Sequence, residues 1–159
     1  MSNGNVFISG ASRGIGNSIA YHFAKNDYVV VGTSRNEFEF DKKIKNLIPV
    51  KLDVTSREDI QNCFNDLKTK NLLPDILINN AGITSDQIFL RMKDEEWDKV
   101  IDTNLNGVFN LSKIFVKNMI KNKKGRIINI SSISGLMGNP GQVNYLSLIH
   151  ISEPTRLRS

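Results

Sequence analysis

Five short apolar runs alternate along the chain with longer segments in which apolar residues recur every three or four positions. The runs are rich in β-branched residues and predict strands over 5–10, 28–34, 48–54, 74–82 and 125–132. The periodic segments predict helices over 16–26, 55–70 and 94–121. Strict alternation of strand and helix is typical of a parallel sheet with helices on both faces, so we expect a doubly wound α/β fold.

The helix over 55–70 has both a start signal and a packing face. Thr55 and Glu58 have the spacing of a capping box, which predicts that Thr55 is the N-cap. One apolar face is formed by Ile60, Cys63, Phe64 and Leu67. We therefore interpret Cys63, the single cysteine, as a packing residue; a lone cysteine also fits a reducing compartment.

Composition places the chain among globular proteins. Its 159 residues are 40% hydrophobic and 23% charged, enough for one domain with a core. No apolar run reaches membrane-spanning length and no signal peptide is visible, so we expect a cytoplasmic protein that does not bind membranes. We assign no residue to a metal.

The formal charge of +5 is scattered except for one cluster, Lys121 to Arg126. Two interpretations stay open: a solvated helix end, or a docking patch for an anionic partner. We do not expect nucleic acid as that partner, because no aromatic residues interleave with the cluster and no binding motif accompanies it.

A glycine-rich turn, "SGASRGIG", follows the first predicted strand and opens the first helix. The spacing of Gly10, Gly14 and Gly16 lets the backbone turn tightly and approach a pyrophosphate at a helix N-terminus. We predict a nucleotide site formed by Gly10, Ala11, Ser12, Arg13, Gly14, Ile15 and Gly16.

The ends of later strands supply further candidates for this nucleotide site. NAD enzymes usually place a carboxylate after the second strand, whereas this chain has Ser34 and Arg35 there. With Arg13 in the first turn, Arg35 favours a 2′-phosphate and hence NADP(H) over NAD; otherwise both are ordinary surface arginines. Further cofactor contacts are expected from Asp53, Val54, Asn80, Ala81 and Gly82, although Asp53 is equally suited to capping the adjoining helix.

Three polar residues are candidates for catalysis. Asn104 shares the inward face of the long helix with Trp97, Val100, Ile101, Val108 and Leu111. Its amide must find partners there, either as a satisfied core group or by holding a water or a catalytic residue. Ser132 ends the fifth strand and Tyr145 follows a loop of glycine and proline; together their hydroxyls could polarise a carbonyl oxygen and protonate it as hydride arrives.

In order and spacing, these motifs resemble the short-chain dehydrogenase/reductase family over residues 1–145. The matching motifs are the glycine turn, "NNAG" at 79–82, "TNLNG" at 103–107, "INISS" at 128–132 and the Tyr145 loop, with Ser9 where threonine is usual. Within the family, "NNAGITSDQIFLRMKDEEWDKVIDTNL" and "GLMGNPGQVNY" are similar to bacterial reductases of 3-oxoacyl groups carried on acyl carrier protein.

The resemblance implies a Rossmann-like fold, NADPH, and reduction of a 3-oxoacyl thioester to a 3-hydroxyacyl one in fatty acid biosynthesis. It also implies a homotetramer for the full-length protein, with Ser132 orienting the substrate, Tyr145 acting as the acid and Asn104 supporting a proton relay. The Lys121 to Arg126 cluster would meet the acidic carrier protein. The alternatives are an acetoacetyl-CoA reductase or another short-chain alcohol dehydrogenase and, in a different class, a non-catalytic dinucleotide-binding fragment.

The chain departs from the family pattern after Tyr145. The family continues Tyr-x-x-x-Lys, whereas position 149 is Ile149. Residues 146–156, "LSLIHISEPTR", are a codon-by-codon translation of a DNA sequence that resembles a sequencing-library adapter. We therefore predict a truncated, incomplete sheet over 1–145, a non-native tail over 146–159, and no catalytic activity for this chain.

Overall fold

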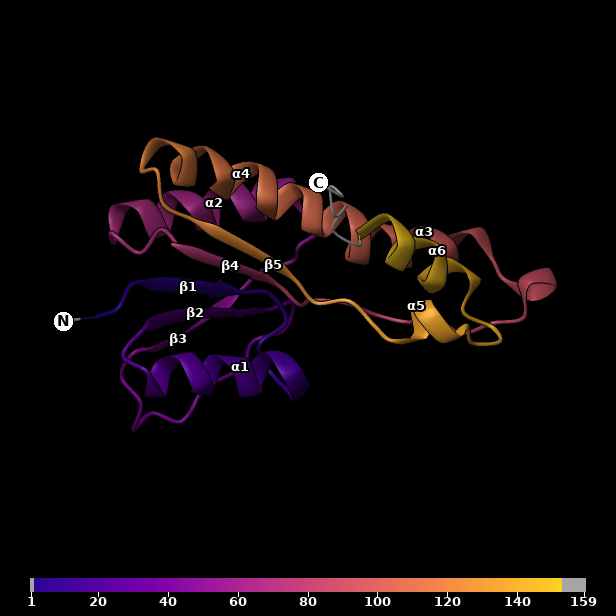
Figure 1. Ribbon diagram of the computed structural model, residues 1–159, viewed down its shortest axis with the longest axis horizontal. Coiled ribbons are helices and arrows are strands. Elements are labelled where there is room, and N and C mark those ends of the chain that lie inside the picture. The colour runs from indigo at the N-terminus through magenta and orange to yellow at the C-terminus, as the bar shows by residue number, and fades with distance from the viewer. Residues whose placement is uncertain (1, 153–159) are drawn as a thin grey trace, which may run out of the picture.

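The computed structural model describes residues 2–152, and a five-stranded parallel sheet is its centre (Figure 1). The strand order is β3-β2-β1-β4-β5. The strands are β1 (Asn5–Ile8), β2 (Val29–Ser34), β3 (Leu47–Lys51), β4 (Ile76–Asn79) and β5 (Arg126–Asn129). All five predicted strands are present, and the Rossmann-like α/β class is confirmed.

Helices cover the two faces of the sheet unequally. Figure 1 shows α1 (Gly14–Lys25) on one face, and α2 (Arg57–Thr69) and α4 (Gly107–Lys121) on the other. The remaining helical segments lie towards the carboxyl ends of the strands; they are η1 (Phe89–Arg91), α3 (Asp94–Ile101), η2 (Asp102–Asn106), α5 (Ser134–Met137) and α6 (Val143–Ser152). No helix within residues 2–152 combines the length and apolarity needed to cross a bilayer.

Alternation of side chains along β1 builds two cores. Phe7 points to the α2/α4 face, where its ring centroid lies 4.9 Å from that of Phe115. Its neighbours Val6 and Ile8 point to the α1 face and pack with Ala20. Apolar residues on both faces explain why the central strands read as continuous apolar runs.

The strict alternation of strand and helix is wrong for the β2–β3 crossover, where no particular helix was predicted. Residues 35–46 contain no helix. Aromatic side chains cover the α1 face of the sheet here instead: the ring of Phe40 packs edge-on against Phe38 at 5.0 Å and against Tyr21 at 6.0 Å. Because this cluster supplies the apolar cover, the crossover needs no helix.

The start of α2 also differs from the prediction. The N-cap is Ser56, whose hydroxyl accepts a hydrogen bond from the amide of Asp59 at 3.1 Å. Thr55 is not the cap, because its amide and hydroxyl both donate to Asp53 Oδ1, at 2.9 and 2.8 Å. The Thr55–Glu58 capping box is therefore wrong by one residue, since a turn at Asp53 has already engaged Thr55.

The long helix predicted over 94–121 is one path with a π-helical turn, η2, between α3 and α4. At the other end of the sheet, β5 is an edge strand whose four residues are all exposed, with Ile127 at 40% and Ile128 at 41%. The helix α6 continues into the segment predicted to be non-native, of which residues 153–159 lie outside the described residues.

Candidate dinucleotide site and active site

The turn between β1 and α1 is built around glycine. Gly10 and Gly14 have φ of +70° and +59°, in the left-handed region that glycine adopts without strain. A Cβ on Gly16 would lie 2.2 Å from the carbonyl oxygen of Gly10. Arg13 stands at the N-cap position and forms no side-chain cap, so side-chain capping leaves the first amides of α1 available to an anion.

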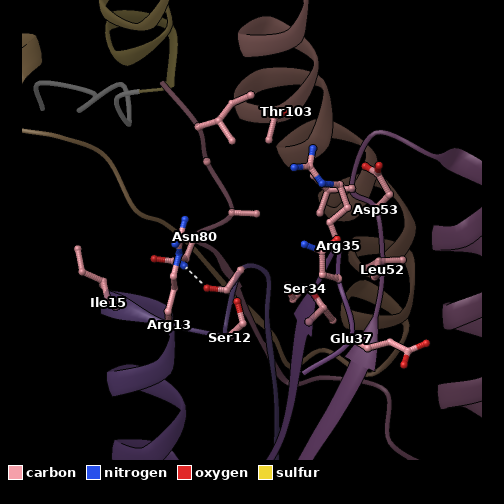
Figure 2. Close-up of a pocket in the computed structure, with 18 residues that line it drawn as sticks. Ser12, Arg13, Ile15, Ser34, Arg35, Glu37, Leu52, Asp53, Asn80 and Thr103 are labelled. Atoms are coloured by element: carbon pink, nitrogen blue, oxygen red, sulfur yellow. Dashed lines mark hydrogen bonds between the residues drawn. The ribbon is translucent and has the colours of Figure 1, made fainter. Parts of the chain in front are cut away.

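A clamp of hydrogen bonds joins this turn to the end of β4. Ser9 Oγ accepts from the amides of Asn80 and Ala81, both at 3.0 Å. In return, Asn80 Nδ2 donates to the carbonyl oxygen of Ser9 at 3.1 Å. It also donates to the carbonyl oxygen of Gly10 at 2.9 Å (Figure 2). Asn80 therefore holds the shape of the turn, and Ser9, for which sequence analysis gave no role, is its partner.

A cavity of about 700 Å³ opens at these strand ends. Twelve of the fourteen predicted cofactor residues line it: Gly10, Ser12, Arg13, Gly14, Ile15, Ser34, Arg35, Asp53, Val54, Asn80, Ala81 and Gly82. Ala11 and Gly16 do not; both are buried and shape the turn from beneath. Thr33, Asn36, Glu37, Leu52, Ile83 and Thr103 also line the cavity and were not predicted.

Charge is concentrated at the end of the cavity formed by β2 and β3. Figure 2 shows Arg35 extending towards Asp53 and Thr103, while the carboxylate of Glu37 extends away from them. Within the described part of the chain, neither Arg13 nor Arg35 forms a side-chain hydrogen bond or ion pair, so both guanidinium groups are available to a ligand. Asp53 accepts two bonds from Thr55 in the turn before α2, so the helix-capping role that sequence analysis left open for Asp53 belongs to Ser56 instead.

A second cavity, of about 590 Å³, adjoins the first and contains the three predicted catalytic residues. Ser132, Tyr145 and Asn104 all line it. The two cavities share Arg13, Ile15, Asn80, Ala81, Gly82 and Ile83. Twelve of the predicted cofactor residues and all three predicted catalytic residues therefore face one continuous hollow along the carboxyl edge of the sheet.

Asn104 lies in the π-helical turn η2, a form that often occurs at functional sites. Its Oδ1 accepts from the amide of Ile83 at 2.9 Å, and its Nδ2 donates to the carbonyl oxygen of Ile83 at 2.8 Å. The amide is thus satisfied, as expected for a polar group on an apolar helix face. It fixes the segment after β4 where both cavities meet.

The hydroxyl of Ser132 takes part in a local turn. It donates to Ser134 Oγ at 3.1 Å and accepts from the amide of Ser134 at 3.2 Å. A ligand carbonyl oxygen that accepts a hydrogen bond from the Ser132 hydroxyl must replace Ser134 Oγ as the acceptor. The retained amide bond would keep the hydroxyl in place during that exchange.

Two buried polar residues beside Tyr145 were missed. Gln142 Nε2 donates to Asp86 Oδ2 at 2.9 Å, and Asn144 Nδ2 donates to the carbonyl oxygen of Ser85 at 3.1 Å. Asn144, fully buried, also accepts from the amide of Tyr145 at 2.8 Å. These bonds tie the start of α6 to the segment after β4; the local sequence is too short for periodicity to reveal them.

Cys63 lies outside both cavities. It packs against the core that Phe7 and Phe115 share, as predicted. Burial raises the pKa of its thiol to about 11, Asp66 adds to the increase, and Lys70 opposes it. The thiol is therefore protonated at neutral pH and poorly nucleophilic.

The residues fit a dinucleotide on three structural observations. The N-terminus of α1 lacks a side-chain cap, a Cβ at Gly14 would meet nothing within 4 Å, and the buried hydroxyl of Thr33 has no partner among the described residues. Each belongs to the first cavity and can be satisfied or filled by a nucleotide. The strand order and this site define a dinucleotide-binding protein of the Rossmann-like class.

Sequence comparison identifies the family. The model of the short chain dehydrogenase family matches residues 4–147, and the chain belongs to that family. It is 42% identical to 3-oxoacyl-[acyl-carrier-protein] reductase FabG of Haemophilus influenzae over 147 residues, 88% of this chain and 60% of that protein. Against the FabG of Escherichia coli K12, identity is 44% over 144 residues, again 88% of this chain and 59% of the relative. The chain thus spans about three fifths of the length of these relatives.

Solved structures agree on the fold and differ in the nucleotide they hold. A 4-hydroxyisoleucine dehydrogenase complexed with NADH superposes with a TM-score of 0.84 at 36% identity, covering 94% of this chain and 64% of that one. ElxO with NADP bound superposes with a TM-score of 0.84 at 38% identity, covering 92% of this chain and 62% of that one. A Leptospira borgpetersenii short chain dehydrogenase with bound NAD⁺ superposes with a TM-score of 0.87 at 29% identity, covering 95% of this chain and 63% of that one. The family therefore uses a nicotinamide dinucleotide, with or without the 2′-phosphate.

Proposed function

We propose that the protein to which residues 1–145 belong is an NADPH-dependent reductase of 3-oxoacyl groups on acyl carrier protein, acting in fatty acid biosynthesis. One observation carries this proposal: a nucleotide cavity is continuous with a second cavity lined by Ser132, Tyr145 and Asn104. The similarity to FabG relatives, at 42–44% identity for two of them, supports the substrate class. We also propose that the full-length protein is a cytoplasmic homotetramer, as the family resemblance implies.

The preference for NADPH is supported by the guanidinium groups of Arg13 and Arg35. Both line the nucleotide cavity with no protein partner in residues 2–152, and no acid directly follows β2. A 2′-phosphate carries charge that arginine binds well, whereas a ribose diol calls for an acceptor such as a carboxylate. Glu37 is the nearest such acid in sequence and lines the cavity, but its carboxylate extends away from Arg35, Asp53 and Thr103 (Figure 2).

The proposed reduction adds a hydride to the carbonyl carbon and a proton to the carbonyl oxygen, from two different donors. A bound nicotinamide supplies the hydride that reduces the 3-carbonyl carbon. Ser132 donates a hydrogen bond to the carbonyl oxygen, replacing its bond to Ser134, and Tyr145 gives that oxygen the proton that completes the alcohol. Asn104 holds the backbone of Ile83 at the junction of the two cavities.

For the 159-residue chain itself we propose a second role, as a non-catalytic dinucleotide-binding fragment. The favouring observation is Ile149, which stands one helical turn after Tyr145 where the family has lysine. The family match ends at residue 147, next to the predicted junction at 146. An uncharged side chain at 149 can neither hold the nicotinamide ribose nor assist proton release from the phenol.

The test uses two proteins: the 159-residue chain and a form completed from the source DNA beyond codon 145. We expect the completed form to oxidise NADPH with 3-oxoacyl carrier protein, and to do so faster than with acetoacetyl-CoA. The 159-residue chain should bind NADPH without turnover. A completed form that prefers acetoacetyl-CoA would favour the alternative reductase, and turnover by the shorter chain would refute its inactivity.

The basic cluster Lys121 to Arg126 is proposed as the carrier-protein docking patch. It lies at the end of α4 that is away from the cavities. The fifteen residues of α4 place the cluster roughly 22 Å from the end of the helix that is near the cavities. We therefore propose that the cluster serves the active site of a neighbouring subunit. Lys124 already forms an ion pair with Asp75 at 3.1 Å, so Lys123 is the freer cation.

Charge reversal in the completed form separates the two lysines. Lys123→Glu should weaken carrier-protein binding more than Lys124→Glu, and neither should change the KM for NADPH. Lys45→Glu, an exposed residue of the β2–β3 crossover, is the control for net charge. Equal binding by all three variants and the parent would refute the docking proposal.

A further inference from the structure

The β2–β3 crossover carries Arg35 to the nucleotide cavity without a helix to support it. Residues 35, 36, 37 and 39 are exposed, and Phe40 is the first buried residue after the strand, at 7% exposure. The position of Arg35 thus depends on where the chain is fixed on either side. One fixed point is Ser34, in register with Lys51 of β3.

Phe40 is the second fixed point. Its ring lies against Gly32 so closely that a Cβ on Gly32 would come within 2.5 Å of Phe40 Cζ. It also packs edge-on with Tyr21, whose hydroxyl accepts a hydrogen bond from the amide of Asp41 at 3.0 Å. One aromatic side chain therefore ties the crossover to both α1 and β2.

We propose that Phe40 is a positioning residue that sets the preference for a phosphorylated ribose by holding Arg35 at the cavity. This inference rests on the proposed use of NADPH. With Phe40 in place, the segment between the two fixed points is the five residues 35–39, of which Phe38 packs against the Phe40 ring itself. Without it, Phe38 and Tyr21 lose the ring that both pack against, and the bond from the amide of Asp41 to Tyr21 loses that support. The next residues fixed to this face independently of Phe40 are Ile44, packed in the same core, and Asn46, which donates to the carbonyl oxygens of Ala24 and Tyr28.

The size of the effect follows from loop closure. If the contacts of Phe38 and Asp41 are lost together with Phe40, the segment would grow from five residues to nine or eleven. The statistical weight of one loop geometry falls as length to the power of about three halves. Loss of Phe40 should therefore weaken binding through Arg35 about two- to three-fold. NADH, which gives Arg35 no 2′-phosphate to bind, should be affected little.

The experiment titrates the 159-residue chain with NADPH and with NADH, following nicotinamide fluorescence. The variants are Phe40→Ala, Phe40→Leu, Arg35→Gln and the Phe40→Ala/Arg35→Gln double variant. Phe23→Leu, which alters the same aromatic core on α1 and not on the crossover, is the matched control. Urea unfolding establishes whether each variant is folded. If Phe40→Ala does not fold, Phe40→Leu takes its place in the comparison.

We expect Phe40→Ala to lower the NADPH-to-NADH affinity ratio two- to three-fold, Phe40→Leu to lower it less, and Phe23→Leu to leave it unchanged. The double variant should match Arg35→Gln alone, because both changes act on one contact. An unchanged ratio in folded Phe40 variants, equal losses for both nucleotides, or additive effects would overturn the inference. A parent chain that binds the nucleotides equally or not at all would overturn the proposed NADPH preference, and this inference with it.

Discussion

Replacing Asn104 by alanine tests how the junction of the two cavities is held. The change removes the donor and the acceptor that bind the backbone of Ile83 at 2.8 and 2.9 Å. Each such bond contributes about 1 kcal/mol net. Because Ile83 lines both cavities, water can reach its freed groups, and the full penalty of a buried unsatisfied pair does not apply. We therefore expect a loss of about 2 kcal/mol in the free energy of unfolding.

Asn106→Ala provides a matched control within the same π-helical turn. Asn106 is exposed and its amide donates only to Asp102, at 2.7 Å. Both variants gain the same helix propensity from alanine, so the difference between them isolates the bonds to Ile83. Urea unfolding at neutral pH measures both free energies. A difference below about 0.5 kcal/mol would show that the contacts of Asn104 do not stabilise the junction, and the reasoning would fail.

Two further predictions concern the glycine turn and the cysteine. Gly16→Ala should abolish NADPH binding, because its Cβ would displace the carbonyl of Gly10; Gly14→Ala, where a Cβ meets nothing within 4 Å, should cost only the left-handed strain of about 1–2 kcal/mol. Fluorescence titration and urea unfolding measure the two effects, and tight binding by Gly16→Ala would contradict the clash. The pKa of Cys63 rises from 9.0 to about 11 on folding, so its contribution to stability is complete below pH 9 and is lost as the pH rises to 11. Cys63→Ala should flatten that decline in unfolding free energy, and an equally steep decline would argue against it.

The hydrophobic pattern of the sequence predicted the strands correctly. It failed for features that depend on a contact with a residue from another element. Strands β1 to β4 were found because burial on one or both faces leaves a direct apolar signature. Strand β5 was found from the apolar pair Ile127 and Ile128, although its four residues are exposed at the edge of the sheet. The α2 cap was misplaced by one residue because Asp53, from the preceding strand end, bonds Thr55. No helix was predicted for the β2–β3 crossover, but the aromatic cluster that covers the sheet there could not be foreseen, since it depends on Phe40 meeting Tyr21 of α1.

The candidate site divides in the same way. Glycines and hydroxyls at strand ends were predicted from position alone, because parallel strands bring their carboxyl ends to one edge. Ser9, Gln142 and Asn144 were not given a role, because each acts through a partner far away in sequence, such as the bond from Asn144 to Ser85. The signal available from sequence was a polar residue on an apolar helix face, and this signal identified Asn104 as a candidate site residue.

The edge strand β5 has a consequence for isotope exchange. The amides of Arg126 and Ile130 donate to the carbonyl oxygens of Asp75 and Asn79, both at 2.9 Å. In a parallel pair, alternate amides face the neighbouring strand, so those of Ile127 and Asn129 face outward. Deuterium should enter these two positions quickly and their neighbours slowly. A strand added at this edge would remove the contrast, because it would protect the outward-facing amides as well.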